Sequence, residues 1–299
     1  MSPFPAREGG TLQACCAIHG RLEPGDDGGT QVVDANRIVD ANGVAEIDAK
    51  GLYYKELNAL LRRLVDGTAG EAIKKIVLRN VVGQRYIATD LDRPVELEIH
   101  GTPGNDLAAF MNGQRVVVHG NAQDGVGNTM NAGEVVVHGH AGDVLGMSMR
   151  GGRVYVRDYV GYRVGIHMKE YLDQVPALVI GGTAQDFLGE YMAGGRIVVL
   201  GLDLAPGQAH HASYIGTGMH NGAIYLRGAF ESYQLGKEVG VVRPGEAAWT
   251  DADQAFVREC AEGYVERFGG DVESILAGDF VKLYAKYLRP YGPLYSWRN

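Results

Sequence analysis

One recurrent spacing runs through the middle of this chain and restricts the folds that it can adopt. Each of three short β-branched runs ends directly before a Gly, and the step between these Gly is 19 both times: VELEIH before Gly101, QRVVVH before Gly120 and GEVVVH before Gly139. The same anchor position recurs outside these runs, at equal or longer steps, at Asn80, Asp158, Gly182, Gly201 and Gly228. A repeat of this length indicates a solenoid built from stacked units, because each unit can bury its apolar side only against its neighbours.

Aliphatic residues occupy two fixed positions in every unit, four and two residues before the anchor. The first column is Ile76, Leu97, Val116, Val135, Val154, Leu178, Ile197 and Ile224. The second column is Leu78, Ile99, Val118, Val137, Val156, Ile180, Val199 and Leu226. Residues i and i+2 of a strand share one face, so these columns predict a row of strands with one aliphatic face turned inward.

A second pair of columns lies in the other half of the unit and stays in step through two insertions. One column is Leu107, Val126, Leu145, Val164, Leu188 and Ile215. The other is the Met column, which holds six of the eight Met of the chain: Met111, Met130, Met149, Met168, Met192 and Met219. Gly residues keep the same steps beside them at Gly127, Gly146, Gly165, Gly189 and Gly216. These columns predict a second buried wall with Gly at its corners.

The fold predicted from the repeat is all-β. We expect a right-handed single-stranded parallel β-helix with about 19 residues per coil, in which like columns stack ~4.8 Å apart. The chain has 44 Gly among 299 residues, about twice the ~7% of an average protein, and tight coil corners account for the excess. A left-handed hexapeptide helix is the alternative, but 19 is not a multiple of six and no six-residue period is visible.

The flanks of the repeat differ from it, which gives four predicted regions. Residues 1–46 are expected to form a loosely ordered arm, 47–75 a capping region, 76–228 the β-helix and 229–299 a helical cap. Amphipathic patterning predicts a helix over 52–66. Two further helices are predicted over 251–268, with Asp251 as N-cap, and over 271–287, before Pro290. We expect these helices to cover the open ends of the coil, whose terminal strands would otherwise pair with other chains.

Composition excludes several functional classes. The net charge of −8, without a basic stripe, argues against nucleic-acid binding. No apolar run is long enough for a membrane span, and the N-terminus lacks the apolar stretch of a signal peptide. The three Cys, at 15, 16 and 260, are too few for a disulfide framework and favour a reducing, cytoplasmic setting.

The sequence offers little evidence of chemistry on this chain. His100, His119 and His138 form a column directly before the anchor and should face outward. Stacked imidazoles could bind a metal, but the column continues with Arg157 and then Gly181, so we favour an exposed or covered ladder. Three Cys are too few for a usual cubane-type cluster, and the Gly-rich strings lack the third Gly of a dinucleotide fingerprint. We therefore expect no catalytic, cofactor-binding or metal-binding residues.

Insertions are where a regular solenoid most often carries its function. The smaller insertion lies between Met168 and Leu178, and the larger one between Gly201 and Ile215. Around these insertions we identify candidate partner-docking residues, with a solvated charged face as the alternative. The candidates are Arg150, Arg153, Arg157, Arg163, Lys169, Tyr171, His210 and His211.

Long stretches of the chain resemble the C-terminal Gly-rich β-helix domain of glutamate synthase in its free-standing, single-subunit form. The resemblance is carried by GNAQDGVGNTMNAGEVVVHGHAGDVLGMSMRGG (120–152) and VGYRVGIHMKEY (160–171). It extends to IDAKGLYYKELNALLRR (47–63), GTPGNDLAAFMNG (101–113) and DFVKLYAKYLRPYG (279–292). The repeat is more distantly similar to the β-helix subunit of formylmethanofuran dehydrogenase and of its bacterial formyltransferase/hydrolase relative.

The resemblance implies a non-catalytic, structural subunit of a glutamate synthase-type complex. Its partners would be a glutamine amidotransferase chain and a synthase chain that carries FMN and an iron–sulfur cluster, and the product would be glutamate or N-methylglutamate. A second copy of this chain is a further possible partner. One alternative is a scaffold subunit of a formylmethanofuran dehydrogenase-like or other metal oxidoreductase complex. A β-helix polysaccharide-active enzyme is less favoured, because such enzymes act outside the cell and line one outer face with acidic or basic groups.

Overall fold

The computed structural model describes residues 31–34, 37–39, 43–66, 73–91 and 93–287. The elements, in chain order, are β1 (Gln31–Asp34), β2 (Arg37–Val39), β3 (Val44–Asp48), α1 (Tyr54–Val65), β4 (Lys75–Val82), β5 (Glu96–Thr102), β6 (Asn112–His119), β7 (Ala132–Val137), β8 (Arg153–Val156), β9 (Ala177–Ile180), β10 (Ala193–Val199), β11 (Asn221–Arg227), the 3-10 helix η1 (Ser232–Gln234), β12 (Val239–Val242), α2 (Asp251–Phe268), α3 (Val272–Leu276) and β13 (Phe280–Ala285). Within these residues the chain is mostly β, with few helices.

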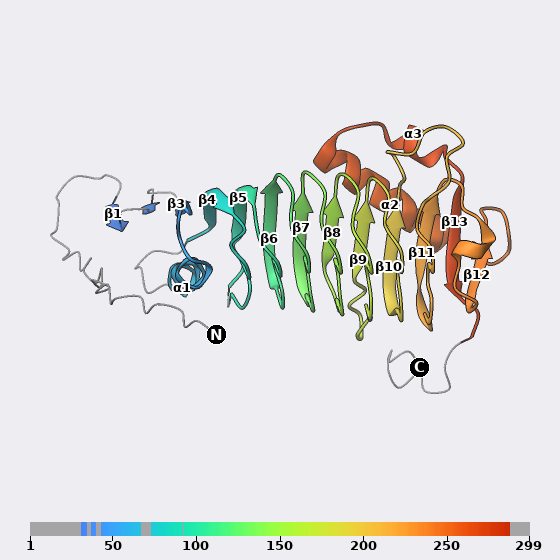
Figure 1. Cartoon of the computed structure of the whole chain (residues 1–299), viewed down its shortest axis with the longest axis horizontal. Helices are drawn as coiled ribbons and strands as arrows, with labels where there is room; N and C mark the ends of the chain where they lie inside the picture. Colours follow the sequence, from blue (N-terminus) through green and yellow to red (C-terminus); the bar gives the residue numbers. More distant parts are fainter. Residues whose placement is uncertain (1–30, 35–36, 40–42, 67–72, 92, 288–299) are drawn as a thin grey trace, which may run out of the picture.

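A single row of parallel strands forms the body of the molecule. Strands β3 to β11 follow one another in chain order, and each pairs in parallel with the next. The arrows in Figure 1 all point the same way along this row, and the chain returns behind the row after each strand. The fold is therefore a parallel β-solenoid, which confirms the fold class at that level.

Residues of one sequence column pair with one another on neighbouring strands, so the columns define the register of the sheet. Leu97 pairs with Val116, its counterpart one period later, and the other members of the first aliphatic column pair in the same way. Val154 pairs with Leu178 across a longer step, because the loop before β9 takes up the inserted residues. Strand pairing thus keeps identical positions in line and leaves each insertion outside the sheet.

The inner columns form one continuous core. Every member of the two aliphatic columns and of the Met column is at most 1% exposed. All of them belong to a single apolar cluster that runs the length of the solenoid. The prediction that these columns point inward is confirmed.

The wall behind the strands has an alternating backbone that explains the Gly column. In one coil Arg163, Gly165 and His167 have φ near +57°, +71° and +55°, and the corresponding residues of the next coil do the same. The amides alternate in direction: Arg163 N donates forward to Asp186 O (3.0 Å), and Gly165 N donates backward to Leu145 O (2.8 Å). A Cβ at Gly165 would lie 2.5 Å from Ile197 Cδ1, so this inward corner requires Gly.

Helix α1 and strands from the predicted arm lie at the N-terminal end of the solenoid. Leu57, Leu61 and Leu64 of α1 are buried in the main core cluster. β3 pairs in parallel with β4, so it continues the strand row, and β1 and β2 extend the sheet in antiparallel fashion. Part of the segment expected to be a loose arm is thus sheet, whereas residues 1–30, with the two neighbouring Cys, lie outside the described residues.

Helix α2 matches the predicted range but lies along the side of the solenoid rather than over its end (Figure 1). It packs on the outer surface of β8 to β11, where Val257, Cys260 and Ala261 form a second apolar cluster with Tyr155 and Tyr225. Its N-cap is Thr250, not the predicted Asp251, because the Thr250 side chain accepts a hydrogen bond from Asp253 N (3.2 Å). Among the described helices, none has the length and apolar character to cross a membrane.

The prediction of a helix over 271–287 is wrong for most of its length. Helix α3 ends at Leu276, and β13 follows it. Val281 and Leu283 pack in the main core and alternate with the less buried Lys282 and Tyr284, as in a strand, while Phe280 packs on the other side with α2. β13 pairs antiparallel with both β11 and β12, so at the C-terminal end of the sheet strands continue the row where helices were expected.

The start of α2 is anchored by the buried carboxylate of Asp253. The Tyr225 hydroxyl donates to Asp253 Oδ1 (2.6 Å), Lys282 Nζ lies 2.8 Å from the carboxylate, and Thr250 N donates to Oδ2 (2.8 Å). Burial alone would raise the pKa of Asp253, but the hydrogen bonds from Lys282, Tyr225 and Thr250 outweigh it and lower the pKa to about 2. Asp253 thereby links the helix, the parallel row and β13.

We expect Met149→Arg to destabilise the solenoid by about 3 kcal/mol or more, because it places an unpaired charge among the stacked Met side chains. Met147→Arg in the same coil is the control, since Met147 is only partly buried. Urea unfolding of the two variants and of the unchanged chain measures the difference. An equal loss of unfolding free energy in both variants would show that a charge in the Met column costs no more than one at a partly buried position.

The lowered pKa of Asp253 makes α2 docking sensitive to acid. The folded-state pKa is about 2 and the ordinary value is 3.8, so the stabilisation is complete above the ordinary value and disappears as the pH falls towards 2. We expect Asp253→Asn to lose about 2 kcal/mol of stability at pH 7, with the difference shrinking steadily below about pH 4. Asp251→Asn, on the exposed side of the same helical turn, should change stability by less than ~0.5 kcal/mol. A stability difference between Asp253→Asn and the unchanged chain that stays constant from pH 7 to pH 2 would contradict this role.

Candidate docking surface

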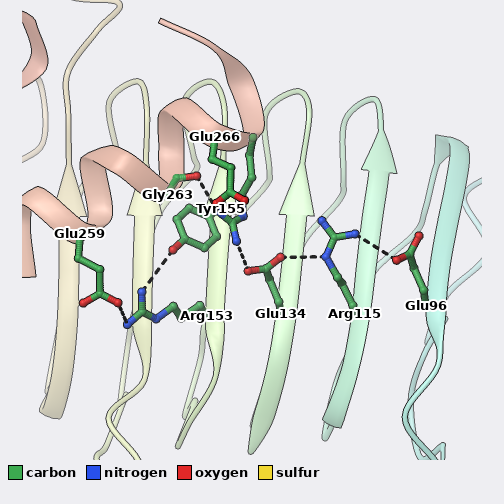
Figure 2. Close-up of polar contacts among 9 residues, drawn as sticks. Glu96, Arg115, Glu134, Arg153, Tyr155, Glu259, Gly263 and Glu266 are labelled. Carbon is green, nitrogen blue, oxygen red and sulfur yellow. Dashed lines mark hydrogen bonds and ion pairs between the residues drawn. The ribbon is translucent and has the colours of Figure 1, made fainter. Parts of the chain in front are cut away.

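A ladder of alternating charges crosses the outer surface of the strand row. Its members occupy one register position on successive strands: Lys75, Glu96, Arg115, Glu134 and Arg153. Lys75 Nζ lies 3.0 Å from Glu96, Arg115 Nη1 lies 3.4 Å from Glu96, and Arg115 Nε lies 3.1 Å from Glu134. Figure 2 shows the part of this ladder from Glu96 to Arg153, with α2 next to its Glu134 and Arg153 end. Opposite charges at neighbouring positions favour this register, because like charges directly opposite would repel.

Helix α2 is fastened to one end of this ladder. Arg267 of α2 contacts Glu134 (2.5 Å), and its guanidinium lies 4.2 Å from the centre of the Tyr155 ring. Arg153 reaches Glu259 of α2 (2.5 Å) and also donates to the Tyr155 hydroxyl (3.4 Å), as Figure 2 shows. The predicted docking residue Arg153 is therefore engaged within the chain, on a surface that α2 already covers.

Arg157 is likewise engaged within its own chain. Its guanidinium donates to both Asp158 oxygens (2.9 and 3.0 Å), and its carbonyl accepts a hydrogen bond from the Tyr264 hydroxyl of α2 (3.0 Å). The Arg157 side chain is still exposed, but it carries a paired charge beside the covered surface.

The opposite wall of the solenoid carries an exposed group of aromatic and basic side chains, which we call the aromatic face. It consists of Tyr162, Arg163, His167, Phe187, Tyr191 and Tyr214. The three Tyr are between 42% and 55% exposed, although their backbones belong to the tightly packed wall. The predicted docking residue Arg163 belongs to this group.

Stacking between coils holds the aromatic face in place. The Phe187 and Tyr214 rings are parallel within 9° at 4.8 Å, and the Arg163 guanidinium lies 4.7 Å from the centre of Phe187. His167 stacks on Tyr191 at 5.5 Å. Tyr191 in turn lies against Gly218 of the next coil, where a Cβ would come within 2.5 Å of its ring. Arg163 also pairs with the buried Glu190 (2.5 Å), which fixes its orientation.

The positions of these side chains follow from the backbone of the wall. Arg163, Phe187 and Tyr214 have positive φ two residues before the Gly of their coils, and His167 and Tyr191 have positive φ two residues after it. These positions point away from the core, so each coil presents two outward side chains in line with those of the next. Tyr, Phe and Arg are enriched at protein interfaces, and Tyr and Arg are among the types that contribute most of the binding energy.

A groove adjoins the aromatic face where the wall turns towards the strands. It is lined by one column of side chains and by the loop of the smaller insertion: Asn112, Asn131, Arg150, Lys169, Tyr171, Leu172, Asp173 and Gln174. The loop is pinned by paired hydrogen bonds between the backbones of Tyr171 and Gln174 (3.0 Å each). His167 and Lys169 flank the buried Met168, so the groove and the aromatic face are continuous. The structure thus brings together Arg150, Lys169 and Tyr171.

The two candidate histidines of the larger insertion differ in burial. His210 is 4% exposed, and its Nε2 lies 2.9 Å from the carbonyl oxygen of Arg227. Burial lowers the pKa of His210, which fits a neutral ring that supports the loop from inside. His211 is exposed and lies 3.0 Å from the side-chain amide of Gln208. We therefore leave His210 out of the docking surface.

A recess beside the start of α2 has the charged lining of a binding site, but its groups bind one another. It has a volume of about 360 Å³ and is lined by Glu170, Arg196, Asp253 and Lys282 among others. Arg196 donates to the Tyr225 hydroxyl (3.1 Å), and Glu170 accepts from Gly195 N (3.2 Å). Together with the contacts of Asp253, these bonds make the recess part of the α2 anchor.

The buried thiol of α2 is chemically inert at neutral pH. Cys260 is fully buried, and burial raises its pKa to about 12, so it stays protonated. It lies on the buried face of α2, within the helix predicted over 251–268.

Two features of the surface were not predicted from the sequence. The aromatic face was detectable, because Phe187, Tyr191 and Tyr214 keep fixed offsets from the Gly column. Glu98 was also detectable, because it lies two residues before His100 on the same side of β5. Within the described residues, Glu98, His100 and His119 are the one group of three or more potential metal ligands close to one another.

Comparison with known proteins gives a clear family match. The family model for the GXGXG motif matches residues 69–291. The chain is 44% identical over 256 residues to the uncharacterized protein MJ1350 of Methanocaldococcus jannaschii. The aligned region covers 84% of this chain and 95% of that protein. A chain of the formyltransferase/hydrolase complex of Methylorubrum extorquens, solved with methylofuran, covers 81% of this chain and 91% of that chain at 14% identity. Its TM-score of 0.49 is too low to support an argument about this protein. The family match spans far more than half of the sequence, and the chain belongs to the GXGXG motif family.

Proposed function

We propose that this chain is a structural subunit of a multi-chain oxidoreductase of the glutamate synthase type. The observation that carries the proposal is the aromatic face: a rigid, exposed set of interface-type side chains on a solenoid whose interior is filled by its own columns. An exposed aromatic cluster of this kind marks a surface for protein contacts. Membership of the GXGXG family agrees with the resemblance of the sequence to the β-helix domain of glutamate synthase.

The finer parts of the proposal follow that resemblance. The partner chains are a glutamine amidotransferase and a synthase that carries FMN and an iron–sulfur cluster, and this chain holds neither cofactor. The complex is cytoplasmic and makes glutamate or N-methylglutamate. The solenoid is a right-handed, single-stranded β-helix with about 19 residues per coil, and α1 is its N-terminal cap. The aromatic face and the adjoining groove, with Arg150, Lys169 and Tyr171, form the docking surface.

A scaffold role in a formylmethanofuran dehydrogenase-like or other metal oxidoreductase complex is the second candidate. The two candidates use the same solenoid and the same docking surface, and they differ in the chains that are bound. The identity of the partner chains therefore separates them.

Affinity purification from cells that encode the chain tests the complex. We expect an amidotransferase chain and a flavin-containing synthase chain to copurify in fixed ratio, and the chain purified alone to show no flavin or iron–sulfur absorption. Mass spectrometry identifies the chains, and light scattering distinguishes a complex from a dimer of this chain. Recovery of formylmethanofuran-type subunits would support the second candidate, and a coloured preparation of the isolated chain would contradict a cofactor-free role.

Substitutions in the aromatic face test the docking surface. Tyr191→Ser and Tyr214→Ser should each weaken partner binding by roughly 2 kcal/mol, about 30-fold, with little loss of folding stability because both rings are exposed. Phe110→Ser is the matched control, since Phe110 occupies the position of Tyr191 in an earlier coil and is 56% exposed. The affinities are compared by titration of labelled chain with the purified partner. Equal effects at all three positions would argue against a localised docking face.

A further inference from the structure

Two adjacent strands bring three potential metal ligands together on the outer surface of the sheet. Glu98 and His100 lie two residues apart on β5 and point to the same side, and His119 of β6 is the register partner of His100. The two imidazoles stack at 4.6 Å with planes 16° apart. Strand pairing therefore fixes the relative position of these groups, on the part of the row in front of α2.

One carboxylate oxygen is shared by both imidazoles. Glu98 Oε1 lies 3.1 Å from His100 Nε2 and 2.9 Å from His119 Nε2, and one ligand atom from each residue lies within 4.8 Å of the other two. Zinc binds imidazole nitrogen and carboxylate oxygen at ~2.0–2.2 Å, so neighbouring ligand atoms of a tetrahedral site are roughly 3.3 Å apart. The two nitrogen–oxygen distances are already close to that value. Rotation of the two rings out of their parallel stack would let all three atoms bind one ion.

We propose that Glu98, His100 and His119 bind a divalent transition-metal ion, for which Zn²⁺ is the best match. Two imidazoles and a carboxylate suit zinc-like ions, whereas magnesium and calcium prefer sites made of oxygen ligands. Three protein ligands leave a fourth tetrahedral position for water or for a side chain of another molecule. The proposal adds to the sequence analysis, which weighed the histidines without Glu98, and it is independent of the proposed scaffold function.

Lys75 prepares the carboxylate for this role. Its Nζ lies 2.5 Å from Glu98 Oε2, so the other oxygen, Oε1, is left facing the imidazoles. The contact with Lys75 thus fixes the carboxylate with Oε1 towards the two rings. Glu96 also contacts Lys75 (3.0 Å) and offsets its positive charge near the ion. A partner that fixes the orientation of a ligand is a common feature of metal sites.

The third histidine of the column has a different environment. The His138 ring lies 5.3 Å from His119 and makes an edge contact with Phe268 of α2 at 5.1 Å. Burial is the main cause that lowers the pKa of His138. We assign His138 to helix packing, so the proposed site ends at His119.

Calorimetric titration of the full chain, without a polyhistidine tag, with Zn²⁺ tests the proposal. We expect one Zn²⁺ per chain with a dissociation constant in the micromolar range or below, and a rise in Tm because the ion binds the folded state. Tetrahedral Co²⁺ should give visible absorption bands with the same stoichiometry. Binding only at millimolar Zn²⁺, or no change in Tm, would overturn the proposal without reference to any variant.

Single substitutions locate the ion. His119→Ala and Glu98→Gln should each weaken Zn²⁺ binding at least tenfold, while circular dichroism stays unchanged because the residues are at the surface. His140→Ala is the matched control: His140 is another histidine of the solenoid surface, stacked on Tyr159 at 4.8 Å, and it is not part of the cluster. Unaltered affinity in His119→Ala, or an equal loss in His140→Ala, would show that the ion binds elsewhere. If His119→Ala loses its fold, His119→Gln replaces it, with the same expected loss.

Discussion

Hydrogen bonding between successive coils in strict register is the constraint on which the rest of this structure depends. The strands pair at identical positions on one wall, and the amides of the other wall donate alternately forward and backward. Because residues at the same position of successive coils lie next to each other, each side chain must pack against one of the same or a similar type. Aliphatic and Met side chains meet this condition inside, where their columns are at most 1% exposed.

The same constraint shapes the outside of the molecule. Like charges at one register position would repel one another, and the sign of the charge instead alternates along the outer ladder from Lys75 to Arg153. Rings at one position stack, as in the Phe187–Tyr214 pair of the wall and the His100–His119 pair of the sheet. A solenoid thus places like groups side by side, and this produces both an aromatic face and a pair of imidazoles that share one carboxylate.

The interior was predictable from the sequence because in-register pairing makes the buried residues recur at a regular spacing along the chain. The outer surface was predictable only in part. Arg153 and Arg157 read as docking residues, but α2 and Asp158 engage them, and helix packing between segments far apart in the chain leaves no period in the sequence. The helix expected over 271–287 failed for a related reason: pairing with β11 and β12 gives Phe280–Ala285 partners that local helical propensity does not reveal.

One part of the outer surface is covered by α2 and another is exposed, which limits where partners can bind. Helix α2 covers the strand row from β8 to β11, and β12 and β13 extend the C-terminal end of the sheet. The wall with Tyr162, Tyr191 and Tyr214 stays exposed in the same coils, directly behind the strands that α2 covers. A partner seated there would contact a surface braced from the far side by the packing of α2 on Tyr155 and Tyr225. Loss of α2 docking would then weaken partner binding without any change in a contact residue, because the braced coils carry the aromatic face.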